Sequence, residues 1–550
     1  MTKTNDFRHA TLGVIKVIEE DGVIVFRGLK YATLNHGFAE PELYGYGQQA
    51  AEDGVVDATR SGPSAVSPPV ACDLELSLIQ KSLAHGKFET SVTDCLNLNL
   101  YLPTPTQQSQ SEFRPLPVFV FIHGGGFMLG SNAWPQYDLT RIVSLSKQLQ
   151  KPVIGVQVNY RLGAYGFLDS SSLREAGVKA NRGLRDQRTA LLWIRQNIAG
   201  FGGDPEQVTV IGESAGGVSC TLHLLSKEPL FKQLVAMSGN SLLMKPLPLP
   251  VAEGTYSQLA SALNIATTKS PSDQLNALLA VDPDTVLASV GPSMPLLPVL
   301  DGDVVTSSVD FAQWTAPNIA AQVPGTQWCR RLMLGDCQFD GSIFILALQS
   351  RKTDIAASFA RSLTTDLKDS PDVVEAILAS YNINPRSNSP TSTSDDEAMN
   401  NILRFMTDVR FYASTLTIAR AWPQSAFVYH FNEPNPWDGP YRGESTHILD
   451  VAFLFQNFND YLSPEQQTSA QRFASDVIAF VHGDDPYQKH SADTGGARVY
   501  GPPCTGEDVY VQSLDPRAYG RRDTVWKLAA RVGMDRLAAA LDGFMARPGS

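Results

Sequence analysis

The sequence predicts an α/β fold built on a central, mostly parallel sheet. Leu116 to Ile122 is an apolar run without alternation, which is typical of a strand buried on both faces. Val153 to Val158 and Val208 to Ile211 are similar runs, and between them the residues from about Asp186 to Ala199 predict a helix with one apolar face. Strand, helix and strand in this order imply a right-handed parallel crossover, so the fold class is α/β.

The rest of the chain adds elements around this sheet. Gly13 to Tyr31 mixes Val and Ile with short turns and predicts a pair of strands before the main fold begins. At approximately 245–440 we expect helical insertions that cover the carboxyl end of the sheet and shape a pocket. A final helix is expected to close the chain, and its apolar face would pack on the parent domain or pair with a second copy in a homodimer. The residues on that face are Trp526, Ala530, Leu537, Leu541 and Phe544.

Length and composition indicate one large, elaborated globular domain over residues 1–550. No stretch reads as an interdomain linker, and 43% of the residues are hydrophobic. The net charge is −12 without a cluster of Lys and Arg, so we expect no nucleic-acid partner. No run of ~18 apolar residues predicts a membrane span. Charged side chains interrupt the first thirty residues, so no signal peptide is predicted and a cytoplasmic location is expected.

A nucleophile motif follows the third apolar run. Gly212-Glu213-Ser214-Ala215-Gly216 connects that short strand to a segment that can start a helix. A sharp strand-to-helix turn strains the serine backbone, and glycine two residues to either side lets the chain pass closely. The Ser214 hydroxyl would project from the turn, and the Ala215 N–H would face the oxyanion of a substrate. A plain turn of small residues is the competing interpretation.

A glycine loop begins where the first apolar run ends, at His123-Gly124-Gly125-Gly126-Phe127. Consecutive glycines let backbone N–H groups face a common point without a side chain in the way, which a developing alkoxide requires. Gly125 and Gly126 are therefore the expected donors of an oxyanion hole, together with Ala215. A tight structural turn is the alternative. His123 is expected to hold this loop rather than to carry a proton.

Five further segments match the phrases of a known family in the same order along the chain. They are Phe26 to Ala32, Thr93 to Leu100, Asn159 to Phe167, Asn181 to Gln187, and Pro298 to Asp303. With the two motifs above, they resemble the type-B carboxylesterase and lipase family, which includes the cholinesterases. The resemblance implies the α/β-hydrolase fold and a serine nucleophile.

The resemblance also implies the two partners of the nucleophile. The family's acid lies in a D-E-G-like segment after a short strand, where Asp340 stands in place of the usual glutamate and Asp336 is the nearby alternative. The family's histidine lies in a glycine-led loop before an aromatic-rich segment, which indicates His447, although the spacing has one additional residue. His482 and His490 also lie late in the chain, but the first is expected in a helix and the second in a polar loop.

These residues predict a serine hydrolase that acts on a small or medium organic ester in two acyl-transfer steps. His447 would take the Ser214 proton, and water would later release the acid. Glu213 is expected to support the charge of the site, and no metal or organic cofactor is required. Two alternatives stay open. One is an acyltransferase, lactonase or cyclase that uses the same triad, and the other is a non-catalytic binding protein, as in the neuroligin-like members that lost the serine.

The resemblance raises two further questions about the segment before the E-D-C-L signature. The family often closes this loop with a disulfide, which implies a Cys72–Cys95 pair here, and the lack of a predicted signal peptide leaves that bond open. Cholinesterases carry a tryptophan in this loop that stacks on a quaternary ammonium, whereas residues 73–94 contain none. Specificity for choline esters through that contact is therefore not expected.

Overall fold

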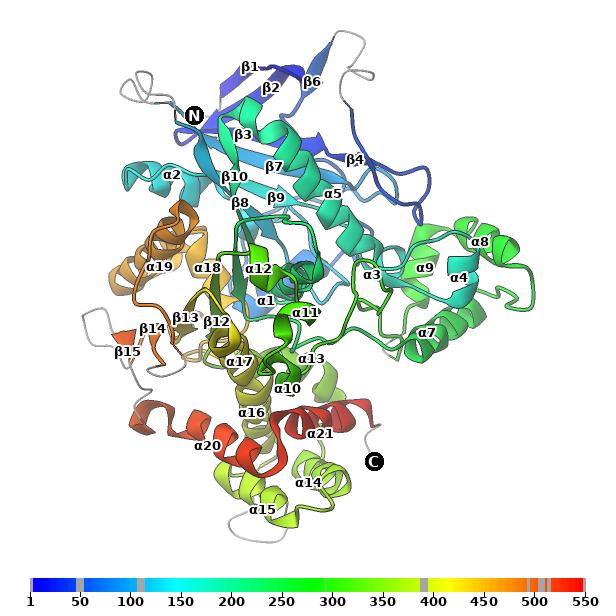
Figure 1. Ribbon diagram of the computed structural model, residues 1–550, viewed down its shortest axis with the longest axis vertical. Helices are drawn as coiled ribbons and strands as arrows, with labels where there is room; N and C mark the ends of the chain where they lie inside the picture. The colour runs from blue at the N-terminus through cyan, green and yellow to red at the C-terminus, as the bar shows by residue number, and fades with distance from the viewer. Residues whose placement is uncertain are drawn as a thin grey trace.

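A computed structural model describes residues 3–45, 54–105, 114–291, 293–385, 394–491, 495–502, 510–511 and 516–547 of the chain. Within these residues, thirteen strands form one sheet in the order β1-β2-β3-β7-β9-β8-β10-β11-β12-β13-β14-β15, with β6 beside β2 (Figure 1). Its strands are β1 (Lys3–His9), β2 (Gly13–Glu20), β3 (Val23–Lys30), β6 (Val55–Asp57), β7 (Asn97–Pro103), β8 (Leu116–Ile122), β9 (Ile154–Val158), β10 (Gly203–Glu213), β11 (Gln233–Met237), β12 (Arg331–Cys337), β13 (Ser425–Phe431), β14 (Ala497–Tyr500) and β15 (Tyr510–Val511). A separate small pair joins β4 (Ala32–Thr33) and β5 (Glu42–Leu43).

The middle of the sheet is parallel and buried on both faces. From β9 through β8, β10, β11, β12 and β13 to β14, neighbouring strands run parallel, whereas the β1–β2–β3–β7 edge is antiparallel. In β8, Val118 and Val120 belong to one hydrophobic core while Phe119 and Phe121 belong to the other. A strand with apolar neighbours on both faces reads as an unbroken apolar run. The predicted α/β class is confirmed.

Helices cover both faces of this sheet. The predicted crossover helix is α5 (Arg182–Asn197), which packs on the same face as α6 (Ala215–Leu222). The opposite face is covered by α2 (Thr140–Gln148), α18 (Leu449–Leu454) and α19 (Pro464–His482). Shorter helices near the amino half are α1 (Ala71–Ile79), α3 (Gly163–Phe167) and α4 (Ser171–Glu175).

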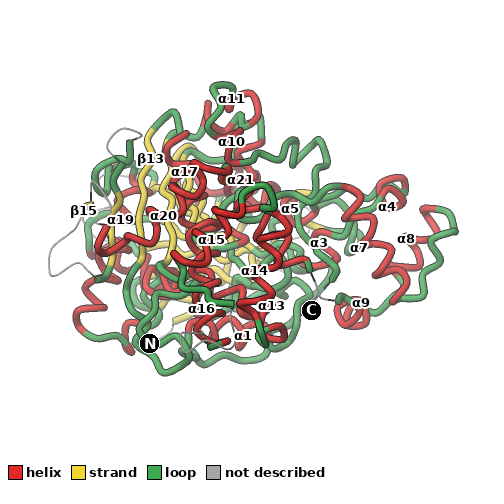
Figure 2. Tube along the Cα trace, turned by 90° about the horizontal axis from the view of Figure 1, so that it is seen from below, coloured by secondary structure: helices red, strands yellow, loops and turns green. Residues whose placement is uncertain are grey.

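The segment expected to hold helical insertions contains two groups of helices separated by strand β12. The first group, whose α7, α8 and α9 stand apart from the sheet in both views (Figures 1 and 2), comprises α7 (Leu249–Ala262), α8 (Pro271–Leu279), α9 (Pro283–Ser289), α10 (Phe311–Trp314), α11 (Ile319–Gln322) and α12 (Gly325–Trp328). The second comprises α13 (Ile345–Leu348), α14 (Ile355–Asp366), α15 (Pro371–Ser380), α16 (Asp395–Met406) and α17 (Ala413–Ala421). A π-helical turn, η7 (Thr407–Tyr412), joins the last two.

The prediction of a single final helix is wrong. Two helices, α20 (Pro516–Val532) and α21 (Met534–Ala546), meet at Gly533, whose φ of 87° breaks the helical path. Ala530, expected on the apolar face, is exposed, because α20 buries Val525 and Leu528 instead. Leu537 and Leu541 of α21 are fully buried in this chain's own core. Those two residues of the predicted dimer face are therefore covered by the parent domain.

Candidate active site

The chain turns sharply between β10 and α6, and Ser214 sits in that turn. Its backbone has φ 52° and ψ −123°, and its N–H donates to the Met237 carbonyl at 2.9 Å. A Cβ added at Gly212 would lie 2.3 Å from the backbone of Gly216, and one added at Gly216 would lie 2.0 Å from the Ile122 oxygen. Only glycine fits these two positions. The strain at Ser214 is of the kind that is found at functional sites.

The glycine loop lies against this turn. Gly125 has φ 93° and Gly126 has φ 60°, conformations that favour glycine. A Cβ at Gly125 would also lie 2.1 Å from the Leu129 oxygen. Both glycines line the same pocket as Ser214. Ala215 is the first residue of α6, so its N–H lacks an intrahelical acceptor. These backbone groups can therefore serve an anion beside the serine.

His123 lies beneath the glycine loop and not in the pocket. It is 2% exposed, its ring stacks on Tyr160 with centroids 4.5 Å apart, and its Nδ1 lies 3.0 Å from the Gly124 oxygen. A Cβ on Gly130 would lie 2.0 Å from that Nδ1, so the loop wraps closely around the ring. Burial lowers the pKa of His123 to about 4. A neutral, enclosed imidazole of this kind supports the loop rather than transferring protons.

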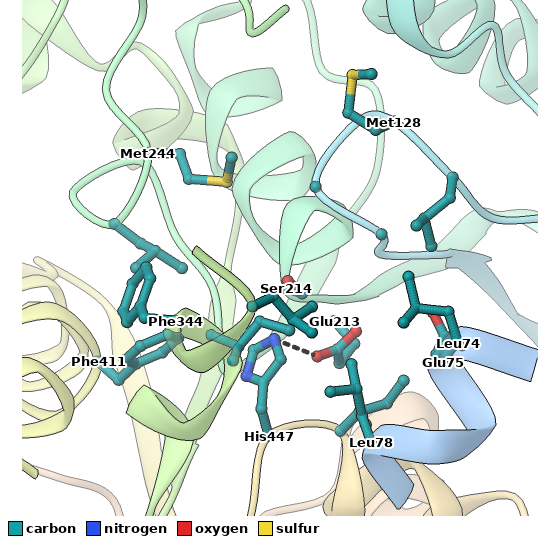
Figure 3. A pocket seen from close by; sticks show the side chains of 17 residues that line it. Leu74, Glu75, Leu78, Met128, Glu213, Ser214, Met244, Phe344, Phe411 and His447 are labelled. Carbon is teal, nitrogen blue, oxygen red and sulfur yellow. Dashed lines mark ion pairs between the residues drawn. The ribbon is translucent and has the colours of Figure 1, made fainter. Parts of the chain in front are cut away.

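His447 joins the site through its two ring nitrogens. Nδ1 lies 2.8 Å from Asp340 Oδ1, and the Cys337 N–H donates to the other Asp340 oxygen at 2.7 Å. Nε2 has no hydrogen-bond partner among the described residues and lies 3.2 Å from Glu213 Oε1. The imidazole stands beside Ser214 at the bottom of the pocket (Figure 3). This arrangement leaves Nε2 available to the serine hydroxyl, whose hydrogen bond often tightens only when substrate is bound.

The alternative acid and histidines have other partners. Asp336 contacts His430 Nδ1 on the neighbouring strand and pairs with Arg522 at 2.7 Å. His482 is the last residue of α19, and His490 pairs with the backbone of β13. None of these residues lines the pocket that contains Ser214. The structure therefore brings together Ser214, Asp340 and His447.

Four buried carboxyl groups lie near the imidazole of His447. Burial raises the pKa of Glu75 to about 7, and burial together with the charge of Asp340 raises that of Asp450 to about 7. Burial also raises the pKa of Glu213 far above its usual range, while at Asp340 the bond to His447 opposes the same effect. Sequence reasoning missed two of these groups. Asp450 follows His447 by three residues and could have been noticed, whereas Glu75 lies in no motif.

The pocket above Ser214 has a volume of about 320 Å³ and mostly apolar walls. In its described lining, the ionisable groups are Glu75, Glu213 and His447, and no lysine or arginine is present. The apolar side chains come from separate segments, and sequence motifs predicted none of them (Figure 3). They are Leu74, Leu78, Met128, Leu129, Leu243, Met244, Ile343, Phe344, Leu346, Phe411 and Ile448.

Cys72 and Cys95, whose pairing the resemblance implied, are free buried thiols in the structure. The Cys72 thiol lies 3.8 Å from Gln136 Oε1, in the first turn of α1. Throughout the described ranges, no group of three or more His, Cys, Asp or Glu side chains could hold a metal ion. Among the helices of the described chain, none has both the length and the apolar character needed to cross a membrane.

Comparison with known proteins gives a consistent result. The model of the "Carboxylesterase family" matches residues 11–510. Para-nitrobenzyl esterase of Bacillus subtilis (strain 168) is 29% identical over 460 residues, which make up 81% of this chain and 82% of that protein. Lipase 4 of Diutina rugosa is 30% identical over 334 residues, 57% of each protein. Lipase 2 of the same organism is matched over 51% of its length, so the chain spans little more than half of these lipases.

Solved structures resemble the whole fold. A structure described as a thermophilic PNB esterase superposes with a TM-score of 0.71 and 25% identity, covering 95% of this chain and all of that chain (100%). Another, described as PNB esterase, has a TM-score of 0.69 and 26% identity over 95% of this chain. The overall architecture of the chain is therefore shared with solved esterases.

The buried carboxyls predict how stability depends on pH. The Asp450 pKa of about 7 exceeds the unfolded value of ~3.9, so the folded chain binds an extra proton between these limits. Stability should fall as pH rises through this window, by up to ~1.4 kcal/mol per pH unit for one group, and then level off. Relative to wild type, Asp450→Asn should therefore gain unfolding free energy between pH 5 and pH 7 in denaturant titrations.

Asp438→Asn is the matched control, because Asp438 is an exposed residue in an i,i+4 pair with Arg442 and should show no such trend. A difference between wild type and Asp450→Asn that stays constant from pH 5 to pH 8 would show that Asp450 is ionised throughout.

Proposed function

This chain belongs to the carboxylesterase family, and on that premise we propose that it is a serine hydrolase of carboxylic esters with Ser214 as its nucleophile. The observation that carries the proposal is the meeting, in one pocket, of a serine on a strained turn and a histidine bonded to a buried carboxylate. Relatives named as esterases and lipases support the same reaction class. The catalytic groups are Ser214, His447 and Asp340.

Acylation begins with a proton transfer to His447. Nε2 takes the proton of the Ser214 hydroxyl while Oγ bonds to the ester carbonyl carbon. Nδ1–H donates to Asp340, which fixes the tautomer and stabilises the imidazolium. Glu213 faces Nε2 at 3.2 Å, so the charged ring has a carboxyl group on either side. Asp340 is the carboxylate that lowers the free energy of this cation, because burial favours the protonated form of Glu213.

The oxyanion forms where the two backbone segments meet. The N–H groups of Gly125, Gly126 and Ala215 donate to the carbonyl oxygen as it becomes negative. Collapse of the tetrahedral intermediate breaks the bond to the alcohol oxygen, and His447 returns the proton to that oxygen. Water then attacks the acyl-serine by the same route, His447 again acting first as base and then as acid. The acid product leaves and the serine hydroxyl is restored.

The pocket favours small or medium esters with uncharged, apolar groups. Its volume of about 320 Å³ and its aliphatic and aromatic walls suit a compact hydrocarbon arm. Above pH about 7, a negative charge on the substrate would face ionised Glu75 without a lysine or arginine in the described lining to pair with it. We expect water as the acceptor.

A cytoplasmic location and a homodimer stay predictions. Cell fractionation tests the first, and the molecular mass in solution tests the second.

Replacement of the nucleophile tests the mechanism. Ser214→Ala should lower kcat for a p-nitrophenyl ester by about 10⁴-fold or more and abolish labelling by a fluorophosphonate, because no other oxygen occupies the strained turn. Asp340→Asn should keep the shape of the site but lower kcat by about 10³- to 10⁴-fold, because the tautomer of His447 is no longer fixed. Initial rates and intact mass measure both effects.

Ser219→Ala provides the matched control. Ser219 lies on α6 one turn beyond Ser214, is fully buried, and contacts Gln187 rather than the pocket. This variant should label and turn over like the wild type. Folded wild type that neither labels nor hydrolyses any ester of a panel would contradict the hydrolase proposal.

A pair of esters of equal length tests the preference for uncharged substrates. At pH 8.5, kcat/KM for p-nitrophenyl hydrogen glutarate should be about 10- to 100-fold below that for p-nitrophenyl pentanoate, because like charges ~6 Å apart repel by a few kcal/mol at an effective dielectric constant of ~20. The uncatalysed rate of each ester is subtracted. The difference should grow as pH rises through about 7, where Glu75 ionises, and Glu75→Gln should remove that growth. Equal kcat/KM for the two esters would contradict a pocket that repels anions.

A further inference from the structure

A cluster of buried charges lies directly behind the acid of the site. Asp336 on β12, His430 on β13, Asp408 on η7 and Arg522 on α20 are each at most 2% exposed. Arg522 Nη2 lies 2.7 Å from Asp336 Oδ2, and its Nε lies 3.6 Å from Asp408 Oδ1. The mechanism above uses none of these four residues. Burial of charged groups costs desolvation free energy, so this cluster favours a role beyond simple packing.

The cluster reaches the site through one residue, Cys337. Arg522 Nη2 also donates to the Cys337 carbonyl at 3.2 Å. The N–H of the same residue, Cys337, donates to Asp340 Oδ2 at 2.7 Å, and Asp340 Oδ1 is bonded to His447 Nδ1 at 2.8 Å. Arg522 is therefore connected to the imidazole through Cys337 and Asp340, over contacts that all lie within hydrogen-bonding distance.

The guanidinium of Arg522 is firmly oriented. Carboxylates lie on two sides of it, and its central carbon lies 4.8 Å from the centre of the Tyr412 ring. Burial alone would raise the pKa of Asp336, but the charges of Arg522 and His430 outweigh burial and hold the pKa below its usual range. An ionised Asp336 keeps the arginine in place, and the arginine in turn holds the Cys337 carbonyl.

We propose that Arg522 is a positioning residue for the triad acid, holding the carbonyl of Cys337 so that the N–H of the same residue orients Asp340 toward His447. The proposal rests on the function proposed above for Asp340 and His447. Neighbouring residues have separate restraints: the Phe339 N–H donates to the Ser445 oxygen, and the Gly341 N–H donates to Thr407 Oγ1. Those bonds fix the turn after Cys337, whereas Arg522 holds the carbonyl of the residue whose N–H donates to Asp340.

Arg522→Lys tests this role in the full-length enzyme. A lysine keeps the charge, but its single nitrogen cannot both face Asp408, as Nε does, and contact Asp336 and the Cys337 carbonyl, as Nη2 does. Active sites are first counted by the fluorophosphonate bound at completion, so that misfolded protein is excluded. Per titrated site, kcat should fall by about tenfold or more while KM stays within about twofold of wild type, because displaced catalytic groups lower the rate more than they lower binding.

Arg182→Lys is the matched control. Arg182 is fully buried and donates to the carbonyls of Tyr165 and Leu168 at 2.7 Å each, away from Asp340. It should lower the melting temperature without changing kcat per titrated site. If Arg522→Lys behaves in the same way, with kcat per site within about twofold of wild type, Arg522 is only structural and the proposal fails.

Asp336→Asn carries the test where Arg522→Lys yields no folded protein. The asparagine keeps the shape of the side chain and removes the charge that orients the arginine, so kcat per titrated site should fall in the same direction with KM unchanged. A wild-type rate per site would overturn the proposal. Wild-type protein that fails to label contradicts the nucleophile assignment instead, so failure of the two proposals can be told apart.

Discussion

Close backbone packing around Ser214 is the constraint on which the site depends. The strand before it, the helix after it and the ends of β8 and β11 converge so tightly that a Cβ at Gly216 would lie 2.0 Å from the Ile122 oxygen and one at Gly239 would lie 2.0 Å from the Ser214 oxygen. This close approach holds Ser214 in a strained backbone conformation with φ of 52°. The same conformation directs the Ser214 side chain away from the crowded turn into the pocket, beside the glycine loop that follows β8.

The parallel sheet explains how distant parts of the chain meet at this turn. Ser214 follows β10, Asp340 follows β12 and His447 follows β13, and the carboxyl ends of parallel strands lie at the same edge of a sheet. The edge is also where acidic side chains collect. Burial raises the pKa of Glu75, Glu213 and Asp450, so these carboxyl groups place few permanent charges around His447 in an apolar pocket.

Local patterns account for what the sequence could predict. The apolar run at Leu116 to Ile122 and the glycines around Ser214 each reflect a constraint that acts within a few residues, and His447 and Asp340 were found through resemblance of short segments. Glu75 and Arg522 could not be found this way, because their roles depend on contacts with residues far away in the chain. The break at Gly533 was missed since a glycine within an apolar period is compatible with one continuous helix. The pocket walls come from many segments, so their apolar character has no sequence signature.

Detection of the acyl-serine intermediate is the most direct test of the central claim, that Ser214 Oγ is the atom acylated during turnover. Rapid mixing with an excess of a p-nitrophenyl ester, followed by acid quenching and peptide mass analysis, measures both the amplitude of the first turnover and the site of the acyl group. The account predicts a burst of p-nitrophenol close to one equivalent per titrated site when deacylation is slower than acylation, and an acyl mass on the peptide that contains Ser214. An acyl group found on a different residue, with none on the Ser214 peptide at any time during turnover, would contradict it.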